Sequence, residues 1–141
     1  MDEPILQGRT RHYLIGPLIE PDGSTTDLTS TTLRFMLKDA MATADAEAEI
    51  DHIAVVNSSG VITSGTGFTI GGTNTTVDPP VVYSGADSGV VTMSLSDEDT
   101  QDITPGPYLW ELVVMRDGEV GQMRAGSVEV IDTLIHTPEV P

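Results

Sequence analysis

The chain has 141 residues, enough for one domain with its own hydrophobic core, and it contains no cysteine. Disulfide bonds and thiolate chemistry are therefore excluded. The chain carries 22 acidic and only 6 basic residues, which gives a formal net charge of −16 at pH 7. Such a surface repels phosphate backbones, so nucleic-acid binding is a poor hypothesis.

The acidic composition has two explanations that the sequence leaves open. Self-repulsion keeps a protein soluble. Alternatively, an acid-rich chain with one lysine, Lys38, is similar to proteins of extreme halophiles, in which salt screens the repulsion. No stretch approaches the roughly 20 apolar residues of a transmembrane helix. The start, Met1-Asp2-Glu3-Pro4, lacks the features of a secretion signal, so we expect neither a signal nor an anchor.

The first part of the chain predicts a polar arm over residues 1–8 and a strand over residues 9–19. Gly16-Pro17 interrupts this strand, which indicates an edge strand or a bulge. After a turn at residues 21–24, a second strand is predicted over residues 31–38. Its side chains alternate with period two, so we expect one face in the core and the other in solvent. The expected core face is Leu33, Phe35 and Leu37, and the expected solvent face is Arg34, Met36 and Lys38.

Residues 39–49 are rich in alanine and acids but lack a broad apolar face, so they predict a loop with room for one helical turn. The alternating Asp45, Glu47, Glu49 and Asp51 would line one solvated face if this region extended into the next strand. Residues 50–56 predict a strand, followed by a turn and a short apolar segment at residues 61–63.

Residues 64–80 form an insertion rich in glycine and threonine. It is longer than the usual connection of about 2–6 residues, and insertions of this kind often contact partners. Phe68-Thr69-Ile70 predicts a short strand inside it, and Phe68 and Ile70 are candidate partner contacts. Residues 81–83 predict a short edge strand. Asn57 and Asn74 each begin an Asn-x-Ser/Thr sequence in a predicted loop, which matches the acceptor pattern for N-glycosylation.

The last part of the chain carries the clearest strands. Residues 88–96 predict one, with Met93 on its apolar face, and residues 97–103 predict a single acidic helical turn capped by Ser96 or Asp97. After Pro105-Gly106-Pro107, a strand continues to Arg116 with both faces largely apolar, which is typical of a central strand. A turn at residues 117–118 leads to a last strand at residues 119–131, and residues 134–141 form a tail.

These elements amount to about seven to nine short strands with little helix, a pattern typical of an antiparallel β-sandwich. Tyr108, Trp110, Leu112, Phe35, Leu33 and Met93 are the predicted core residues. Tyr108, just after the Pro-Gly-Pro segment, resembles a tyrosine corner, in which the ring packs inside and the hydroxyl bonds to the backbone. Four methionines are surface candidates: Met36, Met41, Met115 and Met123.

The order of these pieces resembles the immunoglobulin-like N-terminal domain of phage baseplate upper proteins. The resemblance lies in Asp27-Leu28-Thr29 with Thr32 to Phe35, in Gly89 to Leu95, in Pro105 to Tyr108, and in Gly126 to Val130. It covers roughly residues 9–132, most of the chain. The insertion at residues 64–80 is longer than the family pattern, and within these 141 residues we expect no long C-terminal helix or receptor-binding region after the domain.

The resemblance implies an immunoglobulin-like sandwich over residues 9–133 and a non-enzymatic structural protein of the virion. It would act in the tail, baseplate or neck of a tailed virus, as a homo-oligomer in contact with other virion proteins. Two alternatives stay open: a capsid decoration protein, and a module that binds a host glycan or protein through residues 64–80. Candidate partner contacts are Phe68, Ile70, Met36, Met115 and His136.

No catalytic or cofactor-binding motif stands out. His12, His52 and His136 lie in different predicted elements, so a zinc site is a weak hypothesis compared with ordinary histidines. Asp97, Glu98, Asp99 and Asp102 supply calcium-type oxygens, but an acidic solvated turn is favoured because the calcium-loop order is absent. There is no P-loop, dinucleotide fingerprint or nucleophile elbow. We therefore expect no enzyme activity, no cofactor and no metal.

Overall fold

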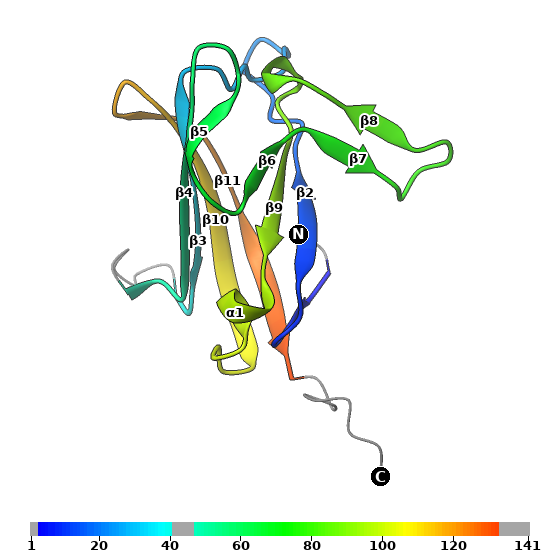
Figure 1. Cartoon of the computed structure of the whole chain (residues 1–141), viewed down its shortest axis with the longest axis vertical. Helices are drawn as coiled ribbons and strands as arrows, with labels where there is room; N and C mark the ends of the chain where they lie inside the picture. Colours follow the sequence, from blue (N-terminus) through cyan, green and yellow to red (C-terminus); the bar gives the residue numbers. More distant parts are fainter. Residues whose placement is uncertain (1–2, 41–46, 133–141) are drawn as a thin grey trace.

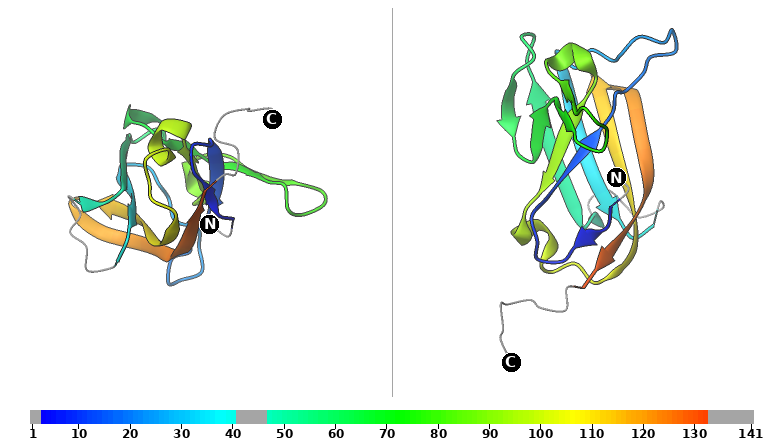
Figure 2. Two further views of the ribbon diagram at one scale, coloured as in Figure 1. Left: turned by 90° about the horizontal axis from the view of Figure 1, so that it is seen from below. Right: turned by 90° about the vertical axis from the view of Figure 1, so that its right-hand side faces the viewer.

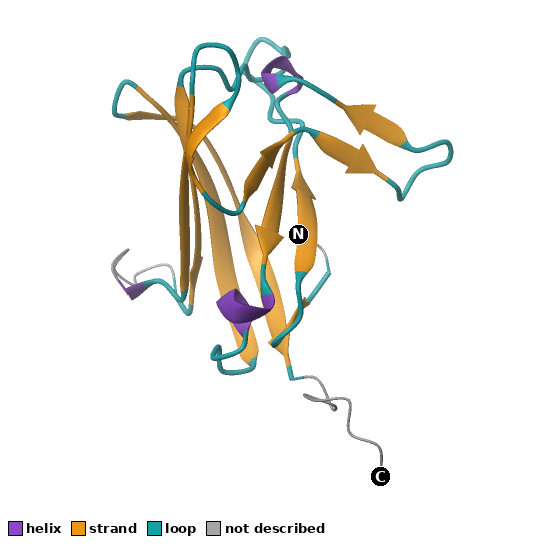
Figure 3. Ribbon diagram, in the orientation of Figure 1, coloured by secondary structure: helices purple, strands orange, loops and turns teal. Residues whose placement is uncertain are grey.

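The computed structural model describes residues 3–40 and 47–132 and is mostly β-strand with almost no helix (Figures 1 and 3). The short helices are η2 (Ala86–Ser88) and α1 (Asp97–Thr100). The strands are β1 (Ile5–Leu6), β2 (Arg11–Ile15), β3 (Thr31–Lys38), β4 (Ile50–Val56), β5 (Ile62–Gly65), β6 (Phe68–Ile70), β7 (Gly72–Asn74), β8 (Val81–Tyr83), β9 (Val91–Leu95), β10 (Gly106–Arg116) and β11 (Glu119–Ile131). The prediction of an all-β protein is therefore confirmed.

The strands form one large sheet, one small sheet and a separate hairpin. The large sheet has the order β1-β11-β10-β3-β4-β5, and the small sheet has the order β2-β9-β6. All pairs are antiparallel except β1 with β11. Figure 1 shows the small sheet in front of the large one, while the β7–β8 hairpin projects sideways from the top of the molecule. The hairpin thus lies apart from the main body.

The core lies between the two sheets. β3 and β10 supply its centre, because their inward side chains are apolar at every second position. Phe35 stacks on Trp110 with ring centroids 6.2 Å apart and an interplanar angle of 18°. The predicted core residues are all buried in this cluster: Leu33, Phe35, Met93, Tyr108, Trp110 and Leu112. The single tryptophan therefore stabilises the fold from its centre.

Two short-range features fix the passage from β9 to β10. Ser96 caps α1: its hydroxyl accepts a bond from the Asp99 N–H, and the Asp99 carboxylate accepts one from the Ser96 N–H. Further on, the Tyr108 hydroxyl donates to the carbonyl oxygen of Thr104 at 2.6 Å. This is the backbone contact expected of a tyrosine corner. The acidic run at residues 97–99 is thus the start of a helix, where carboxylates are favourable.

The N-terminal segment differs from the predicted arm. Ile5 and Leu6 form β1, which pairs in parallel with Val130 and Ile131 of β11. Ile5 is only 1% exposed and belongs to the core. A two-residue strand is too short to show a period in the sequence. The polar residues around Ile5 therefore led to the prediction of an arm over residues 1–8.

The outer face of β3 also differs from the prediction. Met36 and Lys38 are 3% and 7% exposed, although period-two alternation placed them in solvent. Met36 is paired with β10 on one side and with β4 on the other, while Lys38 is paired with β10, where its Nζ is 3.4 Å from Glu111 Oε1. Alternation gives the direction of a side chain but not the neighbours that cover it. Met36 is therefore corrected from an exposed partner contact to a buried residue.

The insertion at residues 64–80 is resolved into several elements. Its start completes β5, Phe68 to Ile70 form β6 beside β9, and the rest builds β7 and the hairpin loop. The chain bends sharply at Gly71 and Gly72, both with positive φ. A Cβ at either position would collide, at Gly71 with the Tyr83 carbonyl oxygen and at Gly72 with the Thr92 hydroxyl. The backbone can therefore leave the small sheet here only with glycine.

Some predictions fall on residues outside the described ranges. These are Met41, Asp45, the tail at residues 134–141 and, within that tail, the candidate contact His136.

Candidate interaction surfaces

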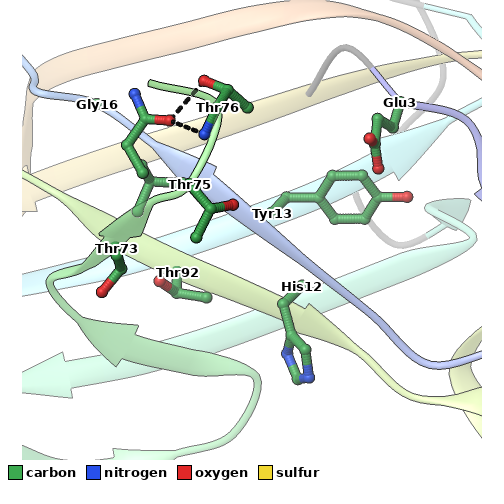
Figure 4. Close-up of a pocket in the computed structure, with 10 residues that line it drawn as sticks. Glu3, His12, Tyr13, Gly16, Thr73, Thr75, Thr76 and Thr92 are labelled. Carbon is green, nitrogen blue, oxygen red and sulfur yellow. Dashed lines mark hydrogen bonds between the residues drawn. The ribbon is translucent and has the colours of Figure 1, made fainter. Parts of the chain in front are cut away.

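An open cleft of about 400 Å³ lies between β2 and the segment formed by β7 and the start of the hairpin loop (Figure 4). Three threonines and one asparagine from residues 73–76 line one side, together with Thr92 of β9. His12 and Tyr13 of β2 and Glu3 line the other side, as Figure 4 shows. The lining is rich in hydroxyl groups, which suits a polar occupant better than an apolar one.

Most polar groups of this cleft already have partners within the protein. Asn74 Oδ1 accepts bonds from the backbone N–H and the hydroxyl of Thr76 at 3.0 and 2.6 Å, drawn as dashed lines in Figure 4. The Thr92 hydroxyl donates to the Gly71 carbonyl oxygen, and the Tyr13 hydroxyl donates to that of Pro4. Burial raises the pKa of Tyr13, and the neighbouring Arg11 offsets part of this. Tyr13 therefore stays protonated at neutral pH and is no proton acceptor.

The β7–β8 hairpin exposes apolar side chains. Val82 is 71% exposed, and Val77 and Val81 are also exposed. The hairpin thus offers a partner both a projecting shape and apolar surface.

The two asparagines of the glycosylation patterns accept hydrogen bonds within their own turns. Asn57 accepts from the N–H groups of Ser59 and Val61, and Asn74 accepts from Thr76 as described.

β11 offers a second surface, at the edge of the large sheet that is furthest from β5 and covered only in part by β1. Val120 and Met123 are 62% and 57% exposed, and only Val128 and Val130 of this strand are buried. A groove of about 480 Å³ separates the end of β2 from Arg124 to Ser127, with Trp110 at its floor. Arg124 and Gln122 reach across to the carbonyl oxygens of Pro17 and Ile19.

The remaining sequence-predicted contacts do not gather into one site. Phe68 and Ile70 are half-buried and pack against the core, so each offers a partner little apolar surface. Met115 is half-buried on the outer face of β10. Met123 is the methionine that the structure places clearly in solvent.

Two histidines in the described residues, His12 and His52, have local partners. The His12 ring lies 2.7 Å from the Ser94 hydroxyl, and His52 Nε2 lies 3.2 Å from Asp99 Oδ2, which ties β4 to α1. Asp99 is thus used by the helix cap and by His52. Within residues 3–40 and 47–132, no three His, Asp or Glu side chains gather in a way that could hold a metal ion.

The sequence predicted the strand at residues 119–131 but not that one of its edges is exposed, because the local pattern of a strand does not show which strands lie beside it. The available signal was the stretch from Val120 to Val128, which contains no acidic residue in a very acidic chain. Of the β7–β8 hairpin, the sequence predicted β8 as a short strand at residues 81–83, whereas β7, which is three residues long, was not distinguished from the rest of the insertion.

In the described part of the chain, no helix has the length and apolarity needed to cross a bilayer. A scan against protein-family models gave no match, and a search of curated proteins gave none either.

Proposed function

We propose that this chain is an immunoglobulin-like structural module of a tailed-virus particle. It acts in the tail, baseplate or neck, in several copies, through contacts with itself and with other virion proteins. The proposal assigns no catalytic residue, no cofactor and no nucleic-acid or membrane partner. The observation that carries it is the strand order of the two sheets, taken with the sequence resemblance.

The strand order agrees with a variable-type immunoglobulin fold. In that fold one sheet has the order G-F-C-C′-C″ and the other contains B-E-D. Here β11-β10-β3-β4-β5 corresponds to the first and β2-β9-β6 to the second, and the correspondence also follows chain order. The β7–β8 hairpin is then an insertion between strands D and E. The resemblance and the topology, which rest on different features, support the same fold.

The Tyr108 contact adds a second point of support. In immunoglobulin-like domains the tyrosine corner lies near the start of strand F, after the E–F connection. Tyr108 lies near the start of β10, the strand that corresponds to F, and bonds to Thr104 four residues upstream. The corner therefore falls in the strand where the proposed fold requires it.

A structural role also fits the available surfaces. The described residues offer an exposed strand, a projecting hairpin and an open polar cleft, whose hydrogen-bonding groups are mostly used internally. Enzyme sites usually combine a deep pocket with a few convergent polar groups that are free to act. Surfaces of the present kind are better suited to protein–protein contacts.

Mass spectrometry of gradient-purified particles tests the virion assignment. Virus particles would be purified from cells that carry the gene for this chain, and the amount of the chain would be measured relative to a capsid protein. We expect it to co-sediment with the particles in a fixed ratio to the capsid protein. A chain that is abundant in lysate and missing from particles would overturn the assignment.

The second candidate function is binding of a host glycan or protein through the insertion. The observation that favours it is the hydroxyl-lined cleft beside the hairpin. Its test is a glycan array followed by titration calorimetry, with His12→Ala in the cleft and Ser64→Ala on β5 as the matched control. Binding that His12→Ala weakens and Ser64→Ala leaves unchanged would support it, whereas no binding to any glycan or host extract component would remove it.

A further inference from the structure

The free edge of β11 has unpaired backbone groups over a defined window. β1 pairs with β11 only at Val130 and Ile131, and the turn to β10 lies at the other end of the strand. A register shift next to Val114 also ends the regular pairing beyond Gln122. Residues 122–128 therefore form a straight edge that no described strand covers, and Figure 2 (right) shows β11 along the rim with β1 at its lower end only.

The direction of the backbone groups in this window follows from one hydrogen bond. The Gln7 N–H donates to the carbonyl oxygen of Ile131, so Ile131 directs its backbone groups away from β10. Because these directions alternate along a strand, Met123, Ala125 and Ser127 also direct their N–H and C=O groups outward. Among the described residues, none donates to or accepts from these outward groups.

The edge also lacks the devices that normally prevent strand pairing. Natural edges carry lysines, prolines, inward charges or bulges that block a second strand. Between Gln122 and Val128 there is no proline, lysine or acid, and the register is regular. The one charged side chain, Arg124, turns back to the carbonyl oxygen of Pro17. An edge of this length without protection is suited to pairing.

We propose that β11 pairs with β11 of a second copy, antiparallel across a two-fold axis at Ala125. This register joins Ala125 to Ala125 and Met123 to Ser127 of the other copy, so all outward groups in the window are satisfied reciprocally. This register places Arg124 opposite Gly126. A shift of one residue toward the β10–β11 turn would instead place Arg124 opposite Arg124. A shift the other way would bring Glu129 into the pairing, next to β1.

The register supports a second copy as the occupant, because residues 122–128 pair with themselves about Ala125 without placing one charged side chain opposite another. Each copy carries a formal net charge of −16, so two copies repel each other over most of their surfaces. The stretch from Val120 to Val128 contains no acid, which reduces this repulsion on the edge, and Glu20, which accepts from Gln122 Nε2, is an acid that lies beside it. The dimer should therefore become tighter as salt rises, because screening removes the general repulsion but leaves the backbone bonds. This interface does not depend on the virion assignment.

Single-cysteine cross-linking tests the proposed register, since the natural chain has no cysteine. In a bonded antiparallel pair the Cα atoms are about 5.5 Å apart, within the range that a disulfide spans. Ala125→Cys should therefore give a covalent dimer on mild oxidation in molar KCl. The matched control is Met123→Cys: the two copies of position 123 are about 13 Å apart along the strands, too far for a disulfide.

We expect the cross-linked fraction of Ala125→Cys to exceed that of Met123→Cys about tenfold or more, because the dimer raises the effective concentration only at the axis. Sedimentation of the natural chain should show a monomer–dimer equilibrium that shifts to dimer with salt. Equal cross-linking of both variants, cross-linking of Met123→Cys alone, or none in either would overturn the proposal. Unchanged melting temperatures of the two reduced variants would show that a difference in cross-linking is not caused by misfolding. Incorporation of the chain into particles is measured separately, so that this proposal and the virion assignment can fail independently.

Discussion

Trp110 shows how single residues fix the relation between neighbouring strands. Its ring stacks on Phe35 of β3, and its Nε1 and Cε2 atoms lie close to Gly126, the residue paired with Trp110 on β11. A Cβ at Gly126 would lie 2.8 Å from Trp110 Nε1 and 3.1 Å from its Cε2 atom. The glycine in β11 is therefore explained by close approach to the ring and not by a turn.

Gly126→Ala should lower the free energy of unfolding by about 1–3 kcal/mol, because the added methyl group overpacks the tryptophan. Urea denaturation followed by Trp110 fluorescence measures this. Gly121→Ala is the control, since the nearest atom to its Cβ would be the Val114 carbonyl oxygen at 3.6 Å, an ordinary contact. Equal stability of the two variants would contradict the packing described for Trp110.

Tyr108 links packing to pH. Burial raises the pKa of its hydroxyl, and the negative charges of Glu49 and Asp39 raise it further. A raised pKa in the folded state means that the stabilisation is complete below the ordinary tyrosine pKa of about 10 and is lost as pH rises above it. Tyr108→Phe also removes the bond to Thr104, which contributes about 1 kcal/mol.

We therefore expect Tyr108→Phe to be about 1 kcal/mol less stable at pH 7 and to lose less further stability than the natural chain above pH 10. Tyr13, whose pKa is also raised by burial, contributes to the loss that remains. Denaturation curves between pH 7 and alkaline pH give both values. A parallel decline of the two proteins would show that Tyr108 ionisation does not act on folding.

At the scale of elements, α1 shows how a few residues connect the two sheets. The Ser96–Asp99 cap fixes the first turn, and Asp99 also contacts His52 of β4. Thr100 is fully buried beneath it, with its hydroxyl near the carbonyl oxygen of Leu6 and accepting from the Gly8 N–H. The turn thus joins the N-terminal segment, the small sheet and β4.

Ser96→Ala should reduce the free energy of unfolding by about 1 kcal/mol, the usual value for loss of an N-cap hydroxyl. Ser64→Ala, on the exposed strand β5, is the matched control and should change stability little. Chemical denaturation of both variants provides the comparison. If Ser96→Ala is as stable as Ser64→Ala, the cap does not stabilise the fold.

The sequence predicted most elements because each long strand carries its own alternating pattern. Leu33 to Leu37, Val91 to Leu95 and Tyr108 to Val114 show this period, and their inward residues are buried. The burial of Met36 and Lys38 and the pairing of Ile5 depend on neighbours distant in the chain, which no local pattern shows. The exposed edge of β11 was missed for the same reason, since an edge is defined by the absence of a partner strand.

At the scale of the molecule, charge is the dominant feature. The net charge of −16 is spread over one domain, so self-repulsion opposes the folded state at low salt. The described ion pairs, such as Arg34 with Asp51 at 2.7 Å, compensate only a small part of it. The screening length falls from about 10 Å at 0.1 M salt to about 3 Å at 1 M, so the repulsion should vanish in that range.

The midpoint of thermal unfolding should therefore rise steadily with KCl into the molar range. Scanning calorimetry at several KCl concentrations measures it, with an uncharged solute of equal osmolality as the control for solvent effects. A midpoint that is the same at low and at multimolar KCl would remove the proposal that the composition is an adaptation to salt.

We propose that this acidic, all-β chain is an immunoglobulin-like structural component of a tailed-virus particle. Electron cryomicroscopy of intact virus particles, purified from cells that carry the gene for this chain, tests the proposal. We expect density that fits the two sheets and the β7–β8 hairpin, repeated with the symmetry of the tail, baseplate or neck. Density on the capsid surface would favour the decoration alternative, and particles that contain no such density would contradict the proposal.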